Sequence, residues 1–336
     1  MNYSWGSAAP DKNPLCAETY PHICYIGAVL GGAVNGATSL NFWRYNHAVN
    51  LDPIQGGREG VKLAFSMLDT LAAWGGWTAR IPQDIAILRS RASEDWFQLK
   101  VLYGDYPGDR IDNTRGFDHF HWLALQLLQN GYLFETYFQD HAEAWEHAES
   151  FKVIILPFPY SMSMTAFGTL AAAVAKGVRV IAIGARGETD ELGNPYPQPL
   201  LKGLIDDGKV GYFAPDLQEK GSYPETVKTF FNILDTSLGD GRTLTLTRYG
   251  KDIQAGCLVN SDADKLIVLI NWSDFDAVAD LGVRMTADKR YRILQRDLDG
   301  VRLLKLCDNE SVTSSDLNSF RVPLKAGEAK ILRIAE

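Results

Sequence analysis

The stretch FKVIILPFPYSMSMTAFGTLAAAVAKGVRVIAIGARGETDELGNPYP, from Phe151 to Pro197, decides the fold. Its first apolar run, Val153 to Pro159, carries no charge, and its second, Val178 to Ile183, is interrupted only by Arg179. Runs of this length, rich in β-branched residues and bounded by turn residues, are typical of strands buried on both faces of a sheet. About 18 residues separate the two runs, which leaves room for one crossover helix. The stretch therefore predicts a βαβ unit with parallel strands.

A ligand site is expected where these two strands end. In open parallel sheets, ligands bind beyond the carboxyl ends of the strands. Here those positions are Pro157 to Ser163 and Ala185 to Asn194. The second contains Arg186-Gly-Glu-Thr-Asp-Glu191, which is the most polar loop of the region.

Further strand-like runs extend the predicted sheet to five strands that alternate with helical stretches. The five are Asp84–Arg89, Phe134–Phe138, Val153–Leu156, Val178–Ile183 and Val210–Phe213. A β/α alternation of this kind indicates an α/β fold with a parallel sheet. We predict that residues 81–240 form a flavodoxin-like, or glutamine-amidotransferase-like, parallel-sheet sandwich.

The last third of the chain, from about Leu244, consists of short strand-like pieces separated by turns that contain Asp, Asn and Gly. These pieces are Leu258–Asn260, Leu266–Asn271, Ala277–Val283, Tyr291–Gln295, Phe320–Val322 and Ala329–Ile334. Short strands at regular spacing are typical of a small antiparallel sandwich. We predict this architecture for residues 241–336.

The opening residues indicate a helix, a strand and a second helix. The helices are expected at Ala17–Gly36 and Glu59–Trp74, and the strand at Ser39–Tyr45. Apolar residues of the second helix recur near a 3.6-residue period, and Gly75 and Gly76 are expected to end it. These elements amount to one and a half units of an α/β barrel and close no core alone. Residues 1–80 are therefore predicted to be a partial barrel remnant.

The composition limits the partners and the compartment. Because 33 Lys and Arg face 41 Asp and Glu, the formal net charge is −8, and no basic cluster suits a nucleic-acid backbone. The four cysteines have no metal-type spacing, which favours buried or free thiols in a reducing, cytoplasmic compartment. No apolar run reaches the roughly 18 residues needed to span a bilayer, and the start lacks the order of a signal peptide. We expect no cofactor, no nucleic acid and no membrane partner.

Two motifs connect the chain to a known family. Asn35-Gly-Ala-Thr-Ser-Leu-Asn-Phe-Trp-Arg44 is a Gly-Ala turn that leads into an aromatic run ending in Trp-Arg. Arg186-Gly-Glu-Thr-Asp-Glu-Leu-Gly-Asn-Pro-Tyr-Pro197 carries an Asp-Glu pair before a Gly- and Pro-containing turn. The first resembles the final barrel strand, and the second a trimerisation-domain loop, of glycoside hydrolase family 42 β-galactosidases. In the order of its regions the chain resembles the carboxyl-terminal half of these enzymes. The resemblance implies β-galactoside substrates and a homotrimer.

The resemblance does not supply the two catalytic glutamates of that family. Retaining glycosidases need one carboxyl group as acid/base and a second as nucleophile. By resemblance, the acid/base strand would lie far upstream of Met1. The nucleophile strand would fall at or just before Met1 to Ser7, where MNYSWGS contains no Glu or Asp. Neither glutamate is carried over to a residue of this sequence.

Carboxyl groups of the strand-end loops are the alternative catalytic candidates. Since strand ends are neighbours in a parallel sheet, Glu94, Asp118 and Glu188 are candidates to converge there. Burial of one of them would raise its pKa toward the range needed for acid catalysis. A structural interpretation stays open: Glu94 favours the first turn of the following helix, and Glu188 lies in a solvated loop.

Other chemistries have weaker patterns. The strand-to-helix elbow, Leu156–Ser161, lacks the Cys that glutamine amidotransferases place there. Ser161 and Ser163 lack the Gly-x-Ser-x-Gly surroundings of a nucleophile elbow, so a helix N-cap is the expected role. His119 and His121 point to different faces of a helix, so no metal site is expected.

Trp43 and Arg44 are the candidates for contact with a sugar. An aromatic face stacks on a pyranose ring, and a guanidinium group binds hydroxyls. Alternatively, the two side chains pack against the helix expected at Glu59–Trp74.

Two classes of function follow. The first is a glycoside-hydrolase-like protein that acts on glycosides through a site of its own, or as part of a split enzyme with a separate barrel subunit. The second is a non-catalytic oligomerisation or carbohydrate-binding module. The expected partners are a small carbohydrate or glycoside and further copies of the chain, which the family resemblance predicts to form a trimer.

Overall fold

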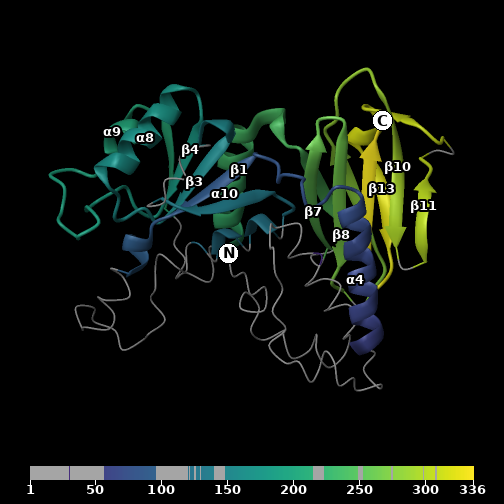
Figure 1. Cartoon of the computed structure of the whole chain (residues 1–336). Coiled ribbons are helices and arrows are strands. Elements are labelled where there is room, and N and C mark those ends of the chain that lie inside the picture. The colour runs from purple at the N-terminus through teal and green to yellow at the C-terminus, as the bar shows by residue number, and fades with distance from the viewer. Residues whose placement is uncertain are drawn as a thin grey trace. The chain divides into compact units, whose positions relative to one another are not determined.

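The computed structural model describes Leu30 and residues 57–95, 120, 122–124, 126–128, 130–139, 148–214, 223–248, 253–273, 275–297, 299–306 and 309–336 (Figure 1). These residues belong to two compact units. The parallel-sheet unit draws on Gln83–Gln126 and Phe134–Arg242. The β-sandwich unit draws on Met1–Pro82, Leu127–Leu133 and Thr243–Glu336. The division into three domains predicted from the sequence stays a prediction.

Five parallel strands form the sheet of the parallel-sheet unit, in the order β2-β1-β3-β4-β5. The strands are β1 (Ile85–Arg89), β2 (Phe134–Phe138), β3 (Val153–Pro157), β4 (Arg179–Ile183) and β5 (Val210–Phe213). The helices that are described from end to end are α8 (Met164–Ala175), α9 (Lys202–Asp206), α10 (Tyr223–Leu238), η2 (Ala148–Ser150) and η3 (Gly239–Gly241). The five predicted strands and their parallel pairing are confirmed.

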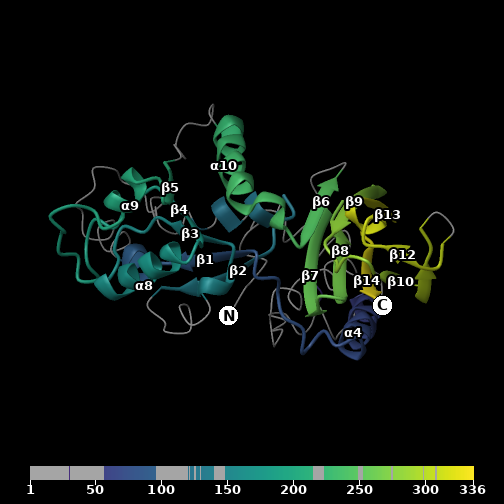
Figure 2. The same cartoon turned by 90° about the horizontal axis from the view of Figure 1, so that it is seen from above.

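Helices cover both faces of this sheet, with α8 and α10 on opposite sides (Figure 2). All five residues of β3 are buried, as expected for a strand between two helical layers. On one face, Leu170 of α8 joins the core formed by Ile154 and Val180. On the other, Phe230 of α10 is fully buried, and its ring centroid lies 5.7 Å from that of Phe213. Ser163 is the N-cap of α8, because its Oγ accepts a hydrogen bond from the Ala166 N–H at 2.9 Å, so the predicted N-cap is confirmed for Ser163 and not for Ser161.

The β-sandwich unit contains two antiparallel sheets. The larger sheet has the order β11-β10-β14-β8-β7, with β12 paired to β10, and the smaller has the order β13-β9-β6. The strands are β6 (Leu244–Arg248), β7 (Ile253–Ser261), β8 (Asp264–Asn271), β9 (Ala277–Val283), β10 (Arg290–Asp297), β11 (Gly300–Leu304), β12 (Val312–Thr313), β13 (Phe320–Leu324) and β14 (Ala329–Ala335), with η4 at Asp316–Asn318. One core lies between the sheets and includes Tyr291, Leu281 and Leu332. The expected antiparallel sheets are present, and β6, β11 and β12 are additional to the predicted strands.

The helix α4 (Gly57–Ala73) covers the outer face of the larger sheet (Figure 1). Its Met67 and Leu71 are buried against Leu266 and Ile331 of that sheet. It ends at Ala73, and Gly75 in the following turn adopts φ +88°, a conformation that glycine takes without strain. The predicted helix at Glu59–Trp74 is thus confirmed.

Several predictions for the opening residues lie outside the described part of the chain. The helix expected at residues 17–36 is described only at Leu30, which is helical and fully buried. The strand expected at residues 39–45 is outside it altogether, so the partial-barrel interpretation stays a prediction. Among the described residues, no helix is long and apolar enough to cross a membrane. Cys257 is buried and forms no disulfide with a described residue.

Candidate functional site

A buried hydrogen-bond network fills the carboxyl edge of the parallel sheet. Its centre is the carbonyl oxygen of Ser161, which follows β3. This oxygen accepts hydrogen bonds from Ser90 Oγ at 2.7 Å, Ser93 Oγ at 3.3 Å and Gln139 Nε2 at 2.9 Å. The Ser161 N–H donates in turn to Ser93 Oγ at 2.7 Å. The backbone of one residue, Ser161, therefore joins the residues that follow β1, β2 and β3.

The loop after β4 joins the same network. The hydroxyls of Ser161 and Thr189 lie 2.9 Å apart, and the Met162 N–H donates to the Thr189 carbonyl at 2.9 Å. Tyr196 Oη donates to the Met162 carbonyl at 3.0 Å. Ser161 has no exposed surface, so its hydroxyl is inaccessible to solvent as well as bound to Thr189.

The strand-to-helix elbow carries a phenylalanine where a nucleophile is placed in amidotransferases. Phe158 directly follows β3 and has φ +49°, in the left-handed region that side chains rarely adopt. Its ring is buried beside Ala185 and stacks on Tyr160 at a centroid distance of 6.1 Å. The backbone thus turns sharply at Phe158, and the side chain at this turn is an apolar ring.

Glu94 is held by an arginine at the end of β1. Arg89 Nε and Nη2 donate to the two carboxylate oxygens of Glu94, each at 2.8 Å. The Arg89 guanidinium also lies over the rings of Phe120 and Phe138, at 4.0 and 4.8 Å from their centroids. Planar, bidentate pairs of this kind are the strong form of ion pair, and this one uses both oxygens of Glu94.

Glu188 and Asp190 bind the backbone of their own loop. Both Glu188 oxygens accept from the Arg186 N–H, at 3.1 and 3.0 Å. Burial raises the pKa of Glu188 above its ordinary value, against the lowering effect of this hydrogen bond. Asp190 accepts from the side-chain amide and the backbone N–H of Asn194, each at 2.8 Å, and the side-chain amide is the main cause that lowers the pKa of Asp190. Within the described residues no hydrogen bond joins Glu94 to Glu188.

The remaining predicted site residues, Trp43, Arg44 and Asp118, lie outside the described residues, as do His119 and His121. Their roles, and the catalytic roles of Glu94 and Glu188, stay predictions. In the part of the chain that the structure describes, no group of three or more His, Cys, Asp or Glu side chains is placed to hold a metal ion.

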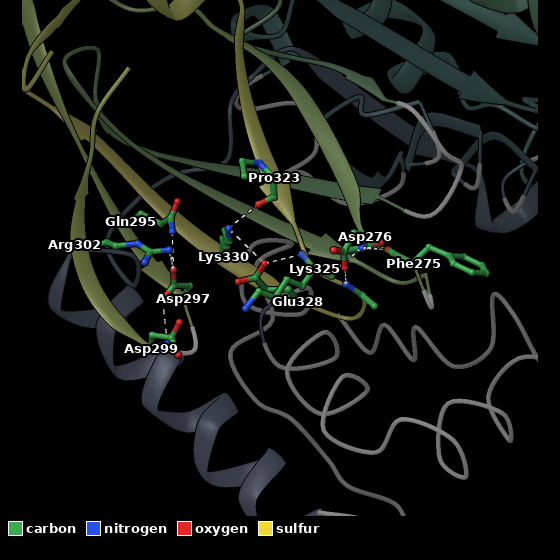
Figure 3. Close-up of polar contacts among 12 residues, drawn as sticks. Phe275, Asp276, Gln295, Asp297, Asp299, Arg302, Pro323, Lys325, Glu328 and Lys330 are labelled. Carbon is green, nitrogen blue, oxygen red and sulfur yellow. Dashed lines mark hydrogen bonds and ion pairs between the residues drawn. The ribbon is translucent and has the colours of Figure 1, made fainter. Parts of the chain in front are cut away.

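A second polar site lies at one end of the β-sandwich, between its two sheets (Figure 3). We call it the sandwich pocket. It has a volume of about 620 Å³, and its lining residues come from β9, β11, β13, β14, the β10–β11 turn and adjoining turns. They are Asp276, Ala277, Val278, Asp299, Arg302, Pro323, Leu324, Lys325, Glu328 and Lys330.

Two buried charged side chains form the floor of the sandwich pocket. Lys330 on β14 is 5% exposed and donates through Nζ to the Pro323 carbonyl of the opposite sheet at 2.6 Å. Its ammonium lies 3.4 Å from Glu328 Oε2, and Glu328 is 6% exposed. The same Oε2 atom accepts from the Lys325 N–H at 2.8 Å. The pair therefore bridges the sheets and closes the β13–β14 turn.

A second buried carboxylate, that of Asp297, organises the side of the pocket formed by the β10–β11 turn. Asp297 is 2% exposed, and its Oδ2 accepts from Arg302 Nη2 at 2.6 Å and from Gln295 Nε2 at 2.7 Å. Its Oδ1 accepts from the Asp299 N–H at 3.0 Å. Figure 3 shows these groups on one side of Lys330 and Glu328, with Asp276 on the other and the Phe275 ring pointing away.

Sequence reasoning missed the sandwich pocket, although a local signal exists. Along β10, Tyr291 and Ile293 enter the core between the sheets, and Gln295 and Asp297 continue the same alternation. Polar residues at positions that continue a core face are the sequence signal of such a site.

The fold is similar to that of solved glycoside hydrolase structures. A structure of an apo exo-carrageenase GH42 from Bacteroides ovatus matches with a TM-score of 0.56 and 11% identity, over 95% of this chain and 39% of that chain. A catalytic mutant of a GH42 β-galactosidase from G. stearothermophilus matches with a TM-score of 0.63 and 12% identity, over 94% and 51%. The β-galactosidase from Bacillus circulans sp. alkalophilus matches with a TM-score of 0.58 and 12% identity, over 88% and 48%.

The similarity is one of fold and not of close sequence. This chain spans about half the length of the β-galactosidases and less of the exo-carrageenase. No family model matches the sequence, and no curated protein matches it.

The opposite pKa shifts of Glu188 and Asp190 predict opposite pH effects on stability. Because the folded-state pKa of Glu188 is raised, its contribution is fully present below the unfolded pKa and is lost as the pH rises through the folded pKa. Relative to Glu188→Gln, the parent protein should lose free energy of unfolding between about pH 4 and about pH 7. Urea unfolding of both proteins at these two pH values measures this difference.

Asp190→Asn is the matched comparison with the opposite sign. Since the pKa of Asp190 is lowered, the parent protein should gain stability relative to this variant as the pH rises through the unfolded pKa from below. Equal pH slopes for the two variants would contradict the assigned environments.

Proposed function

We propose that this chain serves a β-galactosidase-type glycoside hydrolase as a non-catalytic part. In this proposal its described residues support assembly and carbohydrate recognition, and the two carboxyl groups that cleave the glycosidic bond lie outside them. They come from the rest of this chain or from a separate barrel subunit. The observation that carries the proposal is that Glu94 and Glu188 are each bound by their own local partners.

The organisation of the units supports the same proposal. The strand order β2-β1-β3-β4-β5 is the order of flavodoxin-like sheets. We assign this unit to the trimerisation type, and the chain to the carboxyl-terminal half of a family 42-like protein. The fold shared with two β-galactosidases supports this assignment. β-Galactosides in the cytoplasm are the proposed context.

A second candidate function is glycoside cleavage by Glu188 itself. It is favoured by one observation, the raised pKa of this carboxyl at the carboxyl edge of the sheet. Cleavage would require a second carboxyl group nearby, and Glu94 is the predicted partner.

Glycoside turnover separates the two candidates. Purified chain is assayed on chromogenic β-galactosides and β-glucosides, next to Glu188→Gln and Glu94→Gln. We expect equal rates in the three proteins, because neither carboxylate takes part in bond cleavage. Glu149→Gln is the control, since Glu149 forms only an exposed pair with Lys176 on the same unit. A loss of about 100-fold or more in Glu188→Gln alone, with folding intact, would establish the second candidate instead.

We further propose a homotrimer that uses the carboxyl edge of the parallel sheet. Met164 and Leu192 follow β3 and β4, and they are large apolar side chains with 59% and 80% exposure. Light scattering at micromolar concentration should give three times the chain mass of 37.3 kDa. Leu192→Glu should lower that mass, because a charge at an apolar contact opposes association. A monomeric mass for the parent protein would contradict the proposal.

A further inference from the structure

We propose that the sandwich pocket is a binding site for a neutral saccharide, separate from any site of bond cleavage. Its volume of about 620 Å³ falls within the range of about 300–1,000 Å³ typical of small-molecule sites. All of its lining residues belong to the β-sandwich unit. The choice of a sugar rests on the proposed function, whereas the capacity of the pocket to bind a ligand does not.

The pocket lies between the two sheets, at a level where apolar core side chains would otherwise pack. Ile293 on β10 and Leu332 on β14 fill the space between the two sheets. Further along the same faces the side chains become Asp297 and Lys330, both at least nine-tenths buried. Burying such groups in place of apolar ones costs stability, so their presence at the end of the sandwich indicates a role beyond packing.

Some polar atoms on the floor and at the rim of the sandwich pocket have no hydrogen-bond partner among the described residues. Glu328 Oε2 is engaged by Lys325 and Lys330, and Oε1 accepts no hydrogen bond from a described residue. The Arg302 guanidinium has five N–H donors, and it donates to Asp297 through Nη2 alone. The carboxylate of the exposed Asp299 forms no hydrogen bond or ion pair with a described residue. The pocket therefore offers both acceptors and donors to a ligand.

The charge balance of the lining selects a neutral ligand. The cations that contact a buried carboxylate are already paired, Lys330 with Glu328 and Arg302 with Asp297, so no buried charge among the described residues at the pocket lacks a counter-ion. A charged ligand would therefore find no unpaired counter-ion at the buried floor, and burying an unpaired charge costs free energy. Sugar hydroxyls both donate and accept, and the apolar side chains in the lining offer contact to the C–H face of a ring. No described acidic cluster is placed to hold a metal ion, which argues against a cation as the occupant.

Calorimetric titration of the full chain tests the inference. The probes are galactose and lactose, with galacturonate and galactosamine as charged analogues. We expect the neutral sugars to bind and the charged analogues to bind more weakly. Arg302→Ala and Asp299→Ala should each lower the affinity for lactose about tenfold or more, because each removes hydrogen bonds to a charged group. Asp299 is exposed, so its replacement leaves the fold intact.

Arg321→Ala is the matched control. Arg321 is an exposed arginine of the same unit, paired with Asp280 at 2.9 Å, and it does not line the pocket. Its replacement should leave lactose affinity unchanged. The inference is overturned if no neutral sugar binds, if a charged analogue binds more tightly, or if Arg302→Ala and Asp299→Ala leave binding unchanged. These outcomes are independent of glycoside turnover by Glu188→Gln, so the inference and the proposed function fail separately.

Discussion

The hydrogen bonds that converge on Ser161 are the constraint on which the parallel-sheet unit depends. Parallel strands bring their carboxyl ends to one edge, and there the loops need partners for their buried polar groups. Here the partners are supplied internally: one carbonyl receives three side-chain donors from residues after β1 and β2. Thr189 adds the loop after β4. Because the polar groups of this edge bind one another, the edge supports the proposal that the unit is structural and carries no active site there.

In the β-sandwich unit, some buried polar groups keep atoms available for a ligand. Its core is apolar along most of its length, yet at one end charged side chains enter the space between the sheets. Lys330, Glu328 and Asp297 are paired, which makes their burial tolerable, but the pairing leaves hydrogen-bonding atoms open toward the pocket. The two units thus differ in where their buried polar groups find partners.

The sequence predicted those features whose cause is local. Buried parallel strands are continuous apolar runs, so β3 and β4 are visible at once, and the Ser163 cap and the Gly75 stop depend on neighbouring residues. Contacts across the fold escaped prediction, because no spacing rule brings Ser90 to Ser161 or Arg333 to Asp264. Strands such as β6 and β11 were missed because they are short and half-polar.

Native-state hydrogen exchange at the amides of Ser161 and Met162 tests the central claim most directly. If the carboxyl edge is a structural lock, these two amides should be as well protected as those in the middle of β3, because they open only with the whole unit. Protection lower by about 100-fold, equal to about 3 kcal/mol of opening free energy, would contradict the account. It would mark the edge as a locally opening loop region of the kind that binding sites use.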